Sequence, residues 1–161
     1  MSDVKVRSNL SVWIRKKMFN SFIHGEAFDS VGSWWVGLSP ELYEEAACVS
    51  EINYPGYYRI NMWGDQYDPQ SPLKVGTQSI QGHIFYNVLW NWKPVIFPAV
   101  FDSEPVFVIS MYMFKDAMPN SSLEKFSFGA DLINGQVIIT ENESPILYVN
   151  EMKFVFNKAY Q

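Results

Sequence analysis

From Trp34 onward the chain is a succession of short segments rich in aromatic and β-branched residues, separated by residues that favour turns. Segments of this kind, with turns about every 8–12 residues, are typical of antiparallel sandwiches and barrels. We therefore predict a mainly β fold, an antiparallel β-sandwich of about seven or eight strands, in a single domain over residues 1–161. The predicted strands are residues 34–39, 57–62, 77–90, 94–101, 106–114, 124–133, 136–140 and 146–156.

Three local patterns predict how these strands are connected. Residues 77–90 alternate between apolar and polar side chains, which predicts one long, half-buried strand. The dipeptide Asn134-Gly135 is the strongest short hairpin pattern, and it predicts a tight reversal between strands 124–133 and 136–140. Residues 63–76 contain two prolines and two glycines, so we predict a long loop there.

One segment before the strands has helical spacing. Residues 9–24 predict an amphipathic helix, because one apolar stripe recurs at intervals of three and four: Leu10, Trp13, Ile14, Met18 and Phe22. Ser8 or Asn9 is expected to cap its N-terminus, and Gly25 its C-terminus. Such a helix needs an apolar surface to pack on, either in its own chain or in a neighbour's.

Charge and hydropathy exclude several classes of partner. The formal net charge is −5 at pH 7, and the one basic cluster, Arg15 to Lys17, falls in the predicted helix, so we expect no binding to nucleic acid. No apolar run approaches the ~18 residues of a membrane helix, and we expect neither membrane insertion nor a secretion signal. The single cysteine, Cys48, cannot form an internal disulfide, which suits a reducing cytoplasm.

Reactive side chains are scattered along the sequence. The two histidines, His24 and His83, are far apart, and Cys48 has acidic neighbours that disfavour a thiolate. No cluster of Cys, His, Asp and Glu has the spacing of a zinc site, and no phosphate loop or nucleophile elbow is present. We therefore predict no metal, no cofactor and no enzymatic activity.

One acidic, aromatic segment leaves an alternative open. In "WGDQYDP" two carboxylates three residues apart lie beside two aromatic rings, a combination that could hold a sugar or serve as a general acid and base. The same residue types also simply form loops. The alternative is a carbohydrate-binding module, whose candidate sugar contacts are Trp63, Asp65, Tyr67 and Asp68.

The segment "EINYPGYYRINM", residues 51–62, combines three tyrosines and one arginine with a Pro-Gly turn. Gly56 is expected at a tight bend. Arg59 is expected to pair with Glu51 across the turn or to lie over a tyrosine ring. The side chains of this strand that are predicted to face the core are Ile60 and Met62.

The order of motifs along residues 10–140 resembles a group of small phage virion proteins, described as tail fibre-like or minor structural proteins. In that group a helix precedes a "VGL(S/Y)" strand, a "GY-R" segment after a glutamate, an "ITFP"-like strand and a final hairpin. The matching residues here are Val36, Gly37, Leu38, Ser39, Glu51, Gly56, Tyr57, Arg59, Ile96, Phe97, Pro98, Gly135 and Val137. The chain departs from the group in its long insertion at 63–90 and in Tyr58, where the group has a small residue.

This resemblance implies a structural component of a bacteriophage virion, such as a tail, fibre-attachment or decoration subunit, assembled in the host cytoplasm. Its partners would be other virion proteins and further copies of itself as a homo-oligomer, with a glycan receptor as the alternative. Aromatic rings are typical anchors of protein interfaces. The candidate interface residues are two rings of the helix and two of the segment "LWNWKPVIF", where burial of one ring in the core is equally open: Trp13, Phe22, Trp90 and Trp92.

Overall fold

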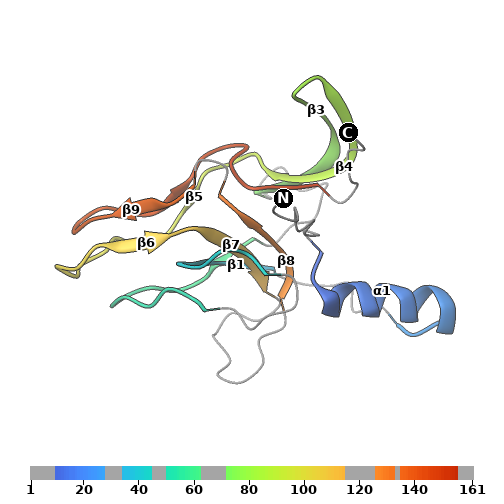
Figure 1. Cartoon of the computed structure of the whole chain (residues 1–161), viewed down its shortest axis with the longest axis horizontal. Helices are drawn as coiled ribbons and strands as arrows, with labels where there is room; N and C mark the ends of the chain where they lie inside the picture. The colour runs from blue at the N-terminus through green and yellow to red at the C-terminus, as the bar shows by residue number, and fades with distance from the viewer. Residues whose placement is uncertain are drawn as a thin grey trace, which may run out of the picture.

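The computed structural model describes residues 10–27, 34–44, 50–62, 72–114, 126–132 and 135–155. Within these ranges the chain has one helix near its N-terminal end and eleven β-strands, all paired antiparallel in sheets that do not close into a barrel (Figure 1). The predicted mainly β, antiparallel fold with one helix is therefore confirmed. The strands outnumber the predicted seven or eight because several predicted strands are interrupted.

A four-stranded sheet forms the centre of the described fold. Its order is β2 (Ile60–Asn61), β1 (Trp35–Ser39), β7 (Ser110–Phe114) and β8 (Phe126–Asp131). β1 and β7 pair over their whole length, with Trp35 opposite Phe114 and Ser39 opposite Ser110. This long, regular ladder gives the smaller sheets a surface on which to pack.

Both faces of the four-stranded sheet are covered, because successive side chains of a strand point to opposite sides. The residues that one face contributes to the main hydrophobic core are Val36, Leu38, Met111 and Met113. The other face joins a smaller aromatic cluster, which consists of Trp35, Tyr43, Tyr112 and Phe114. The sheet is thus an inner layer of the molecule.

Three smaller sheets complete the described fold. β3 (Leu73–Ile80), β4 (His83–Asn91) and β11 (Lys153–Val155) form one of them, in the order β11-β4-β3. β5 (Val95–Ile96) pairs with β10 (Ile146–Leu147), and β6 (Val106–Val108) pairs with β9 (Val137–Ile139). The residues that these sheets add to the main core include Leu73, Leu89, Val95, Val108, Ile139, Leu147 and Phe154.

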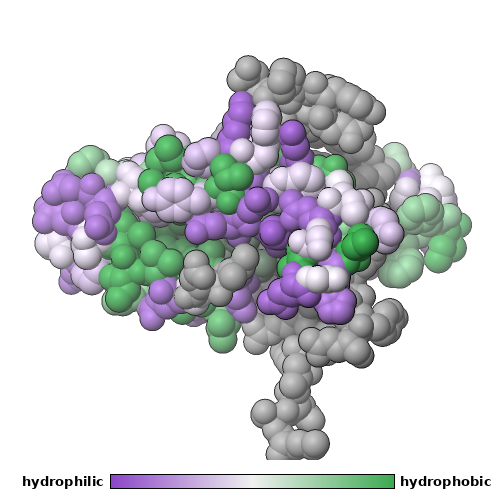
Figure 2. Space-filling view, turned by 90° about the horizontal axis from the view of Figure 1, so that it is seen from above, coloured by the Kyte–Doolittle hydropathy of each residue, from purple (hydrophilic) through white to green (hydrophobic). Residues whose placement is uncertain are grey.

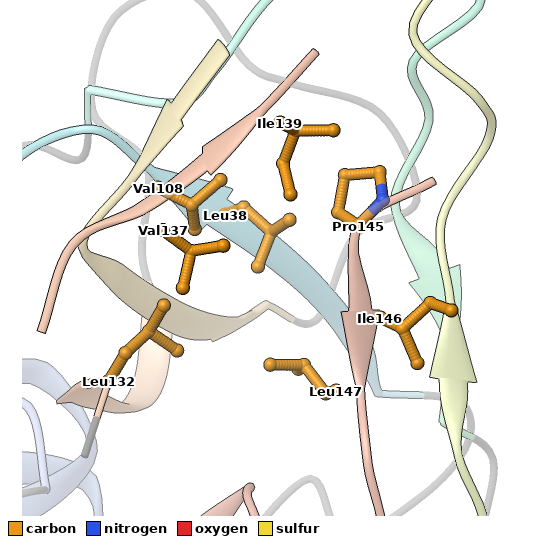
Figure 3. Close-up of a pocket in the computed structure, with 8 residues that line it drawn as sticks. All are labelled: Leu38, Val108, Leu132, Val137, Ile139, Pro145, Ile146 and Leu147. Atoms are coloured by element: carbon orange, nitrogen blue, oxygen red, sulfur yellow. The ribbon is translucent and has the colours of Figure 1, made fainter. Parts of the chain in front are cut away.

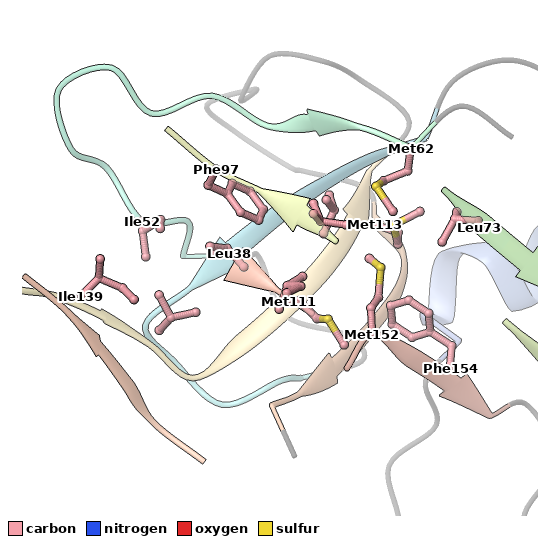
Figure 4. Close-up of a cluster of buried hydrophobic side chains, with 14 of the residues drawn as sticks. Leu38, Ile52, Met62, Leu73, Phe97, Met111, Met113, Ile139, Met152 and Phe154 are labelled. Carbon is pink, nitrogen blue, oxygen red and sulfur yellow. The ribbon is translucent and has the colours of Figure 1, made fainter. Parts of the chain in front are cut away.

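Four methionines lie inside the main core, each with less than 2% of its surface exposed: Met62, Met111, Met113 and Met152. Figure 4 shows them between strands of different sheets, with Leu73 and Phe154 nearby. An unbranched thioether side chain adapts to irregular gaps. Methionine therefore suits a core that is assembled from several short strands.

A buried asparagine ties the C-terminal part of the described chain to β4. The side-chain amide of Asn91 donates to the carbonyls of Leu147 (3.3 Å) and Tyr148 (2.9 Å), and its oxygen accepts from the N–H of Met152 (3.0 Å). Asn91 is fully buried, so these bonds satisfy polar atoms that would otherwise be costly to remove from water. They fix the turn that separates β10 from β11.

The predicted single strand over residues 77–90 is wrong. The chain reverses at Gln81 and Gly82, so that β3 and β4 form a hairpin in which Ile80 lies opposite His83. Both turn residues have positive φ, 51° for Gln81 and 80° for Gly82, as the two central positions of a type I′ turn require. Glutamine is unusual in this conformation, so the turn has no recognisable sequence pattern. β3 also begins at Leu73, inside the loop predicted over 63–76.

The predicted hairpin at Asn134-Gly135 is wrong as well. β8 pairs with β7, whereas β9 pairs with β6, so β8 and β9 do not pair with each other. The two pairs are successive parts of one ribbon, because the chain passes directly from β6 to β7 at Ile109. Asn134 itself lies outside the described residues, and the N–H of Gly135 donates to the carbonyl of Leu132 (3.1 Å) between the ends of β8 and β9.

The helix α1 (Val12–His24) lies within the predicted range 9–24. Its N-cap is Ser11, whose Oγ accepts from the N–H of Ile14 (3.1 Å), so the predicted cap at Ser8 or Asn9 is wrong. Gly25 is left-handed (φ 66°) and caps the C-terminus as predicted. α1 packs on β8 and projects beyond the sheets (Figure 1), so Ile14 is its one fully buried residue.

Phe154 joins two sheets and provides a test of this core. Its strand pairs with β4, its ring lies 5.9 Å from that of Phe128 on β8, and it is fully buried. We expect Phe154→Ala to lower the free energy of unfolding by about 3–5 kcal/mol. The matched control Phe101→Ala, at a ring that is 69% exposed, should change it by less than about 0.5 kcal/mol. Urea denaturation measures both values, and equal effects would contradict the described packing.

Candidate functional site

A buried ion pair stands beside the four-stranded sheet. The Arg59 guanidinium contacts the Glu51 carboxylate through Nη2, 2.7 Å from Oε2, and through Nε, 3.0 and 3.1 Å from the two oxygens. Only 1% of the arginine side chain and 8% of the glutamate side chain are exposed. A forked, charge-assisted contact of this kind is among the strongest polar interactions in proteins.

Gly37 in β1 makes room for this ion pair. A Cβ at position 37 would lie 2.5 Å from Oε1 of Glu51 and 2.8 Å from the ring of Phe114. Any larger residue would therefore displace the carboxylate or the ring. The Arg59 guanidinium lies 3.6 Å from the centroid of the Phe114 ring, which adds a cation–π contact.

Tyr57 completes the polar network. Its hydroxyl donates to Oε1 of Glu51 (2.7 Å) and accepts from the N–H of Leu38 (3.1 Å). Burial, followed by the nearby Glu51 carboxylate, raises the pKa of Tyr57 well above its ordinary value, so the hydroxyl remains a donor at neutral pH. The Tyr57 ring stacks on Phe97, with centroids 6.2 Å apart and planes 6° apart.

This network confirms the predicted pairing of Arg59 with Glu51, and Gly56 (φ 85°) forms the predicted bend. The ring under the guanidinium is Phe114 instead of a tyrosine. Four residues of the motif pattern therefore converge on one centre: Gly37, Glu51, Tyr57 and Arg59. Both charges are buried and engaged, so the network holds β1 to the 51–59 segment and offers no open reactive group.

Removing one partner of this pair should be far more damaging than removing both. We expect Arg59→Met to lower the free energy of unfolding by about 3–5 kcal/mol, because it leaves the Glu51 carboxylate buried without its cation. The double variant Glu51→Met/Arg59→Met should be less destabilised than Arg59→Met alone, because no unpaired charge stays buried. A double-mutant cycle in urea measures this coupling. A cost below about 1 kcal/mol for Arg59→Met, as at exposed pairs, would contradict it.

Tyr54 predicts how stability changes at alkaline pH. Its hydroxyl donates to the carbonyl of Pro98 (2.7 Å), and burial, followed by Tyr58, raises the pKa of Tyr54 to about 12. The unfolded chain loses this proton near pH 10, so the stability that Tyr54 contributes is complete below pH 10 and falls as the pH rises towards about 12.

We therefore expect Tyr54→Phe to cost about 1 kcal/mol at pH 8, because one hydrogen bond is lost. At pH 11.5 the wild type should exceed the variant by less in its free energy of unfolding. The wild type loses stability between pH 10 and pH 11.5 because Tyr54 ionises in its unfolded chain, whereas the variant has no hydroxyl at this position to ionise. Urea unfolding at the two pH values measures both differences. A difference that is unchanged or larger at pH 11.5 would refute the assignment.

An apolar pocket lies between the β6-β9 ribbon and β10 (Figure 3). Its cavity volume is about 40 Å³, and the residues that line it are Leu38, Val108, Leu132, Val137, Ile139, Pro145, Ile146 and Leu147. A pocket for a polar substrate needs a few placed polar groups to orient it. These eight side chains are all apolar, so the polar atoms that also line the pocket belong to the backbone.

Trp90 lies near the end of β4 and Trp92 directly follows it, and both are half-buried. Trp90 packs over Gly76, where an added Cβ would lie 3.2 Å from its ring. The Trp92 ring lies under two cations, with its centroid 3.9 Å from Nζ of Lys74 and 5.3 Å from Nζ of Lys93. Both rings therefore already have contacts within the chain, and their role at an interface stays a prediction.

The outward face of α1, defined as Val12, Phe19, Phe22 and Ile23, is apolar and exposed to solvent. The exposed fractions of Phe19, Phe22 and Ile23 are 63%, 85% and 70%. Figure 2 shows hydrophobic side chains gathered at the end of the molecule where α1 projects. Of the predicted helix contacts, Phe22 belongs to this face, whereas Trp13 is half-buried with Nζ of Lys17 4.8 Å from its ring.

Val12, Phe19 and Ile23 were missed from the sequence because a single apolar stripe was considered. Val12, Phe19 and Ile23 recur at intervals of seven and four, which also places them on one side of a helix. α1 is therefore apolar on two sides, one towards β8 and one towards solvent. That second spacing is the pattern that could have identified this face.

The segment of the predicted sugar site is not described in the structure. The candidate sugar contacts Trp63, Asp65, Tyr67 and Asp68 lie outside the described residues.

Within the described ranges, no group of three or more His, Cys, Asp or Glu residues is placed to hold a metal ion, and no helix is long and apolar enough to cross a membrane. The sequence matches no protein-family model, and no curated protein matches it significantly.

Proposed function

We propose that this chain is a non-catalytic structural subunit of a bacteriophage virion, in a tail, at a fibre attachment or as a decoration protein, and that it works through contacts with other virion proteins. The observation that carries the proposal is the outward face of α1, which presents four large apolar side chains to solvent. Burial of apolar surface contributes roughly 25 cal/mol per Å², so this face favours association. A virion is proposed as the site of this association because the order of motifs along residues 10–140 resembles that of small phage virion proteins.

The way α1 is held favours a contact role. Its N-terminal turn is anchored by the buried Ser11 and Ile14, and Leu10 bridges to Phe128 of β8. Towards its C-terminal end the exposed fraction rises to 85% at Phe22. An isolated helix of 13 residues is marginal in water. A partner that covers the outward face would therefore bury apolar surface and also stabilise the helix.

The proposal predicts that particles contain this chain and hold it through α1. Phe22→Gln keeps a residue of adequate helix propensity and removes the most exposed ring. We expect it to lower the number of copies per particle about tenfold, as the loss of an interface anchor worth about 1.4 kcal/mol would do. Quantitative mass spectrometry of particles purified from producing cells measures this number. Tyr86→Gln, at a ring that is 61% exposed on β4, is the control and should enter particles normally.

Two outcomes would count against this function. Particles from which the wild-type chain is absent would remove the virion role. Specific binding of monomeric chain to a glycan array, abolished by substitution of Trp63 and Tyr67, would support the carbohydrate-binding alternative in its place.

A further inference from the structure

The end of the molecule opposite α1 is both acidic and apolar. Two segments lie side by side there, since the N–H of Val100 donates to the carbonyl of Glu143 (2.8 Å) and Val106 lies opposite Ile139. Figure 1 shows β6 and β9 at one end of the long axis and α1 towards the other. The residues that we call the acidic end are Phe101, Asp102, Glu104, Phe107, Ile138, Glu141 and Glu143.

The acidic end exposes large apolar side chains among carboxylates. Phe101, Phe107 and Ile138 are 69%, 41% and 54% exposed, and the last two are cross-strand partners, so they share one face of the ribbon. Residues 100–108 and 137–144 contain four carboxylates and no Lys, Arg or His. The Glu143 carboxylate accepts the N–H of Thr140 (2.8 Å), and this bond lowers its pKa and keeps it ionised.

The helix has the opposite sign. Val12–His24 contains Arg15, Lys16 and Lys17, with His24 in the last turn, and no Asp or Glu. At 100° per residue, Arg15 and Lys16 fall on either side of the row formed by Val12, Phe19 and Ile23. An apolar centre with a charged rim is the usual composition of a protein interface, and this helix and the acidic end have rims of complementary charge.

We propose that the outward face of α1 docks on the acidic end of a second copy of this chain, head to tail. The inference rests on the proposed function for its setting and deepens it by naming the partner. The two surfaces differ and lie at opposite ends, so each added copy leaves one α1 and one acidic end unoccupied. Repetition closes into a ring if the rotation between copies allows it, and otherwise builds a filament. A symmetric dimer through α1 alone would bring like charges together, which is unfavourable.

Two variants, each of which blocks one of the two surfaces, distinguish head-to-tail docking from other modes of association. The head variant, Phe19→Gln/Ile23→Gln, retains adequate helix propensity, and the tail variant, Phe107→Thr/Ile138→Thr, retains β propensity. In sedimentation velocity and light scattering, the mass of the wild type should rise with concentration, and each variant alone should need about tenfold more protein to associate. An equimolar mixture of the two should form a complex of two chains and stop there, because only one intact α1 and one intact acidic end remain per pair.

Charge reversal tests the pairing of the rims. Lys16→Glu should weaken association, and so should Glu104→Lys/Glu141→Lys, because each places like charges face to face. Combining all three changes in one chain should restore part of the association, which a general loss of solubility or folding would not do. Ile84→Thr, at a side chain that is 63% exposed on β4, is the matched control and should associate like the wild type. Thermal melts confirm that each variant is folded.

Three results would overturn the inference: a wild-type chain that stays monomeric up to its solubility limit, folded head and tail variants that form no two-chain complex when mixed, or an association that the tail variant leaves unchanged. Its failure is separable from that of the proposed function. A monomeric chain that still enters particles through Phe22 would leave the virion role standing with a different partner. Two-chain complexes without any copies in particles would support the contact and remove the virion role.

Discussion

The ion pair between Arg59 and Glu51 is the interaction on which the geometry of the central sheet depends. Two charges taken out of water cost several kcal/mol each unless their partners are placed well. Here the carboxylate receives a forked guanidinium and the Tyr57 hydroxyl, and the glycine of β1 leaves the space that this arrangement occupies. Because such contacts tolerate little displacement, they set how the 51–59 segment lies against β1. The apolar core adapts around that fixed point.

The central sheet also relates the two ends of the molecule. α1 packs on β8, and β8 pairs with β7, which continues at Ile109 into β6 of the acidic end. One ribbon therefore runs from the basic, apolar helix to the acidic, apolar end. The distance and orientation between these two surfaces follow from backbone pairing, so a head-to-tail contact would transmit a defined geometry from one copy to the next.

Local patterns in the sequence predicted the fold class, and interactions between distant segments account for the errors. Alternation and turn spacing were sufficient for an antiparallel β protein with one helix capped by Gly25. The turn at Gln81 was not predicted because its left-handed conformation is usually adopted by Asn, Asp or Gly. The hairpin prediction at Asn134-Gly135 was wrong because β8 and β9, the strands on either side, pair with β7 and β6, which are more distant in sequence.

In the candidate site, too, contacts between residues close in sequence were predictable and contacts between distant segments were not. Glu51 and Arg59 are close in sequence, so their pairing was predictable from charge and turn geometry, whereas the Phe114 ring beneath them comes from a distant strand. Spacing indicates that α1 is apolar on two sides, but it does not indicate which of the two sides packs on β8. Which side meets β8 depends on where the sheet ends, and that is a property of the assembled fold.

The four core methionines make the interior of this protein chemically vulnerable in a way that a core of leucine and valine would not be. While the sheets stay closed, the sulfur atoms of Met62, Met111, Met113 and Met152 are shielded from oxidants. If the chain opens before its assembly is complete, oxidation would convert a thioether into a polar sulfoxide that no longer fits between the sheets. Rapid, lasting closure of the core is therefore also a form of chemical protection.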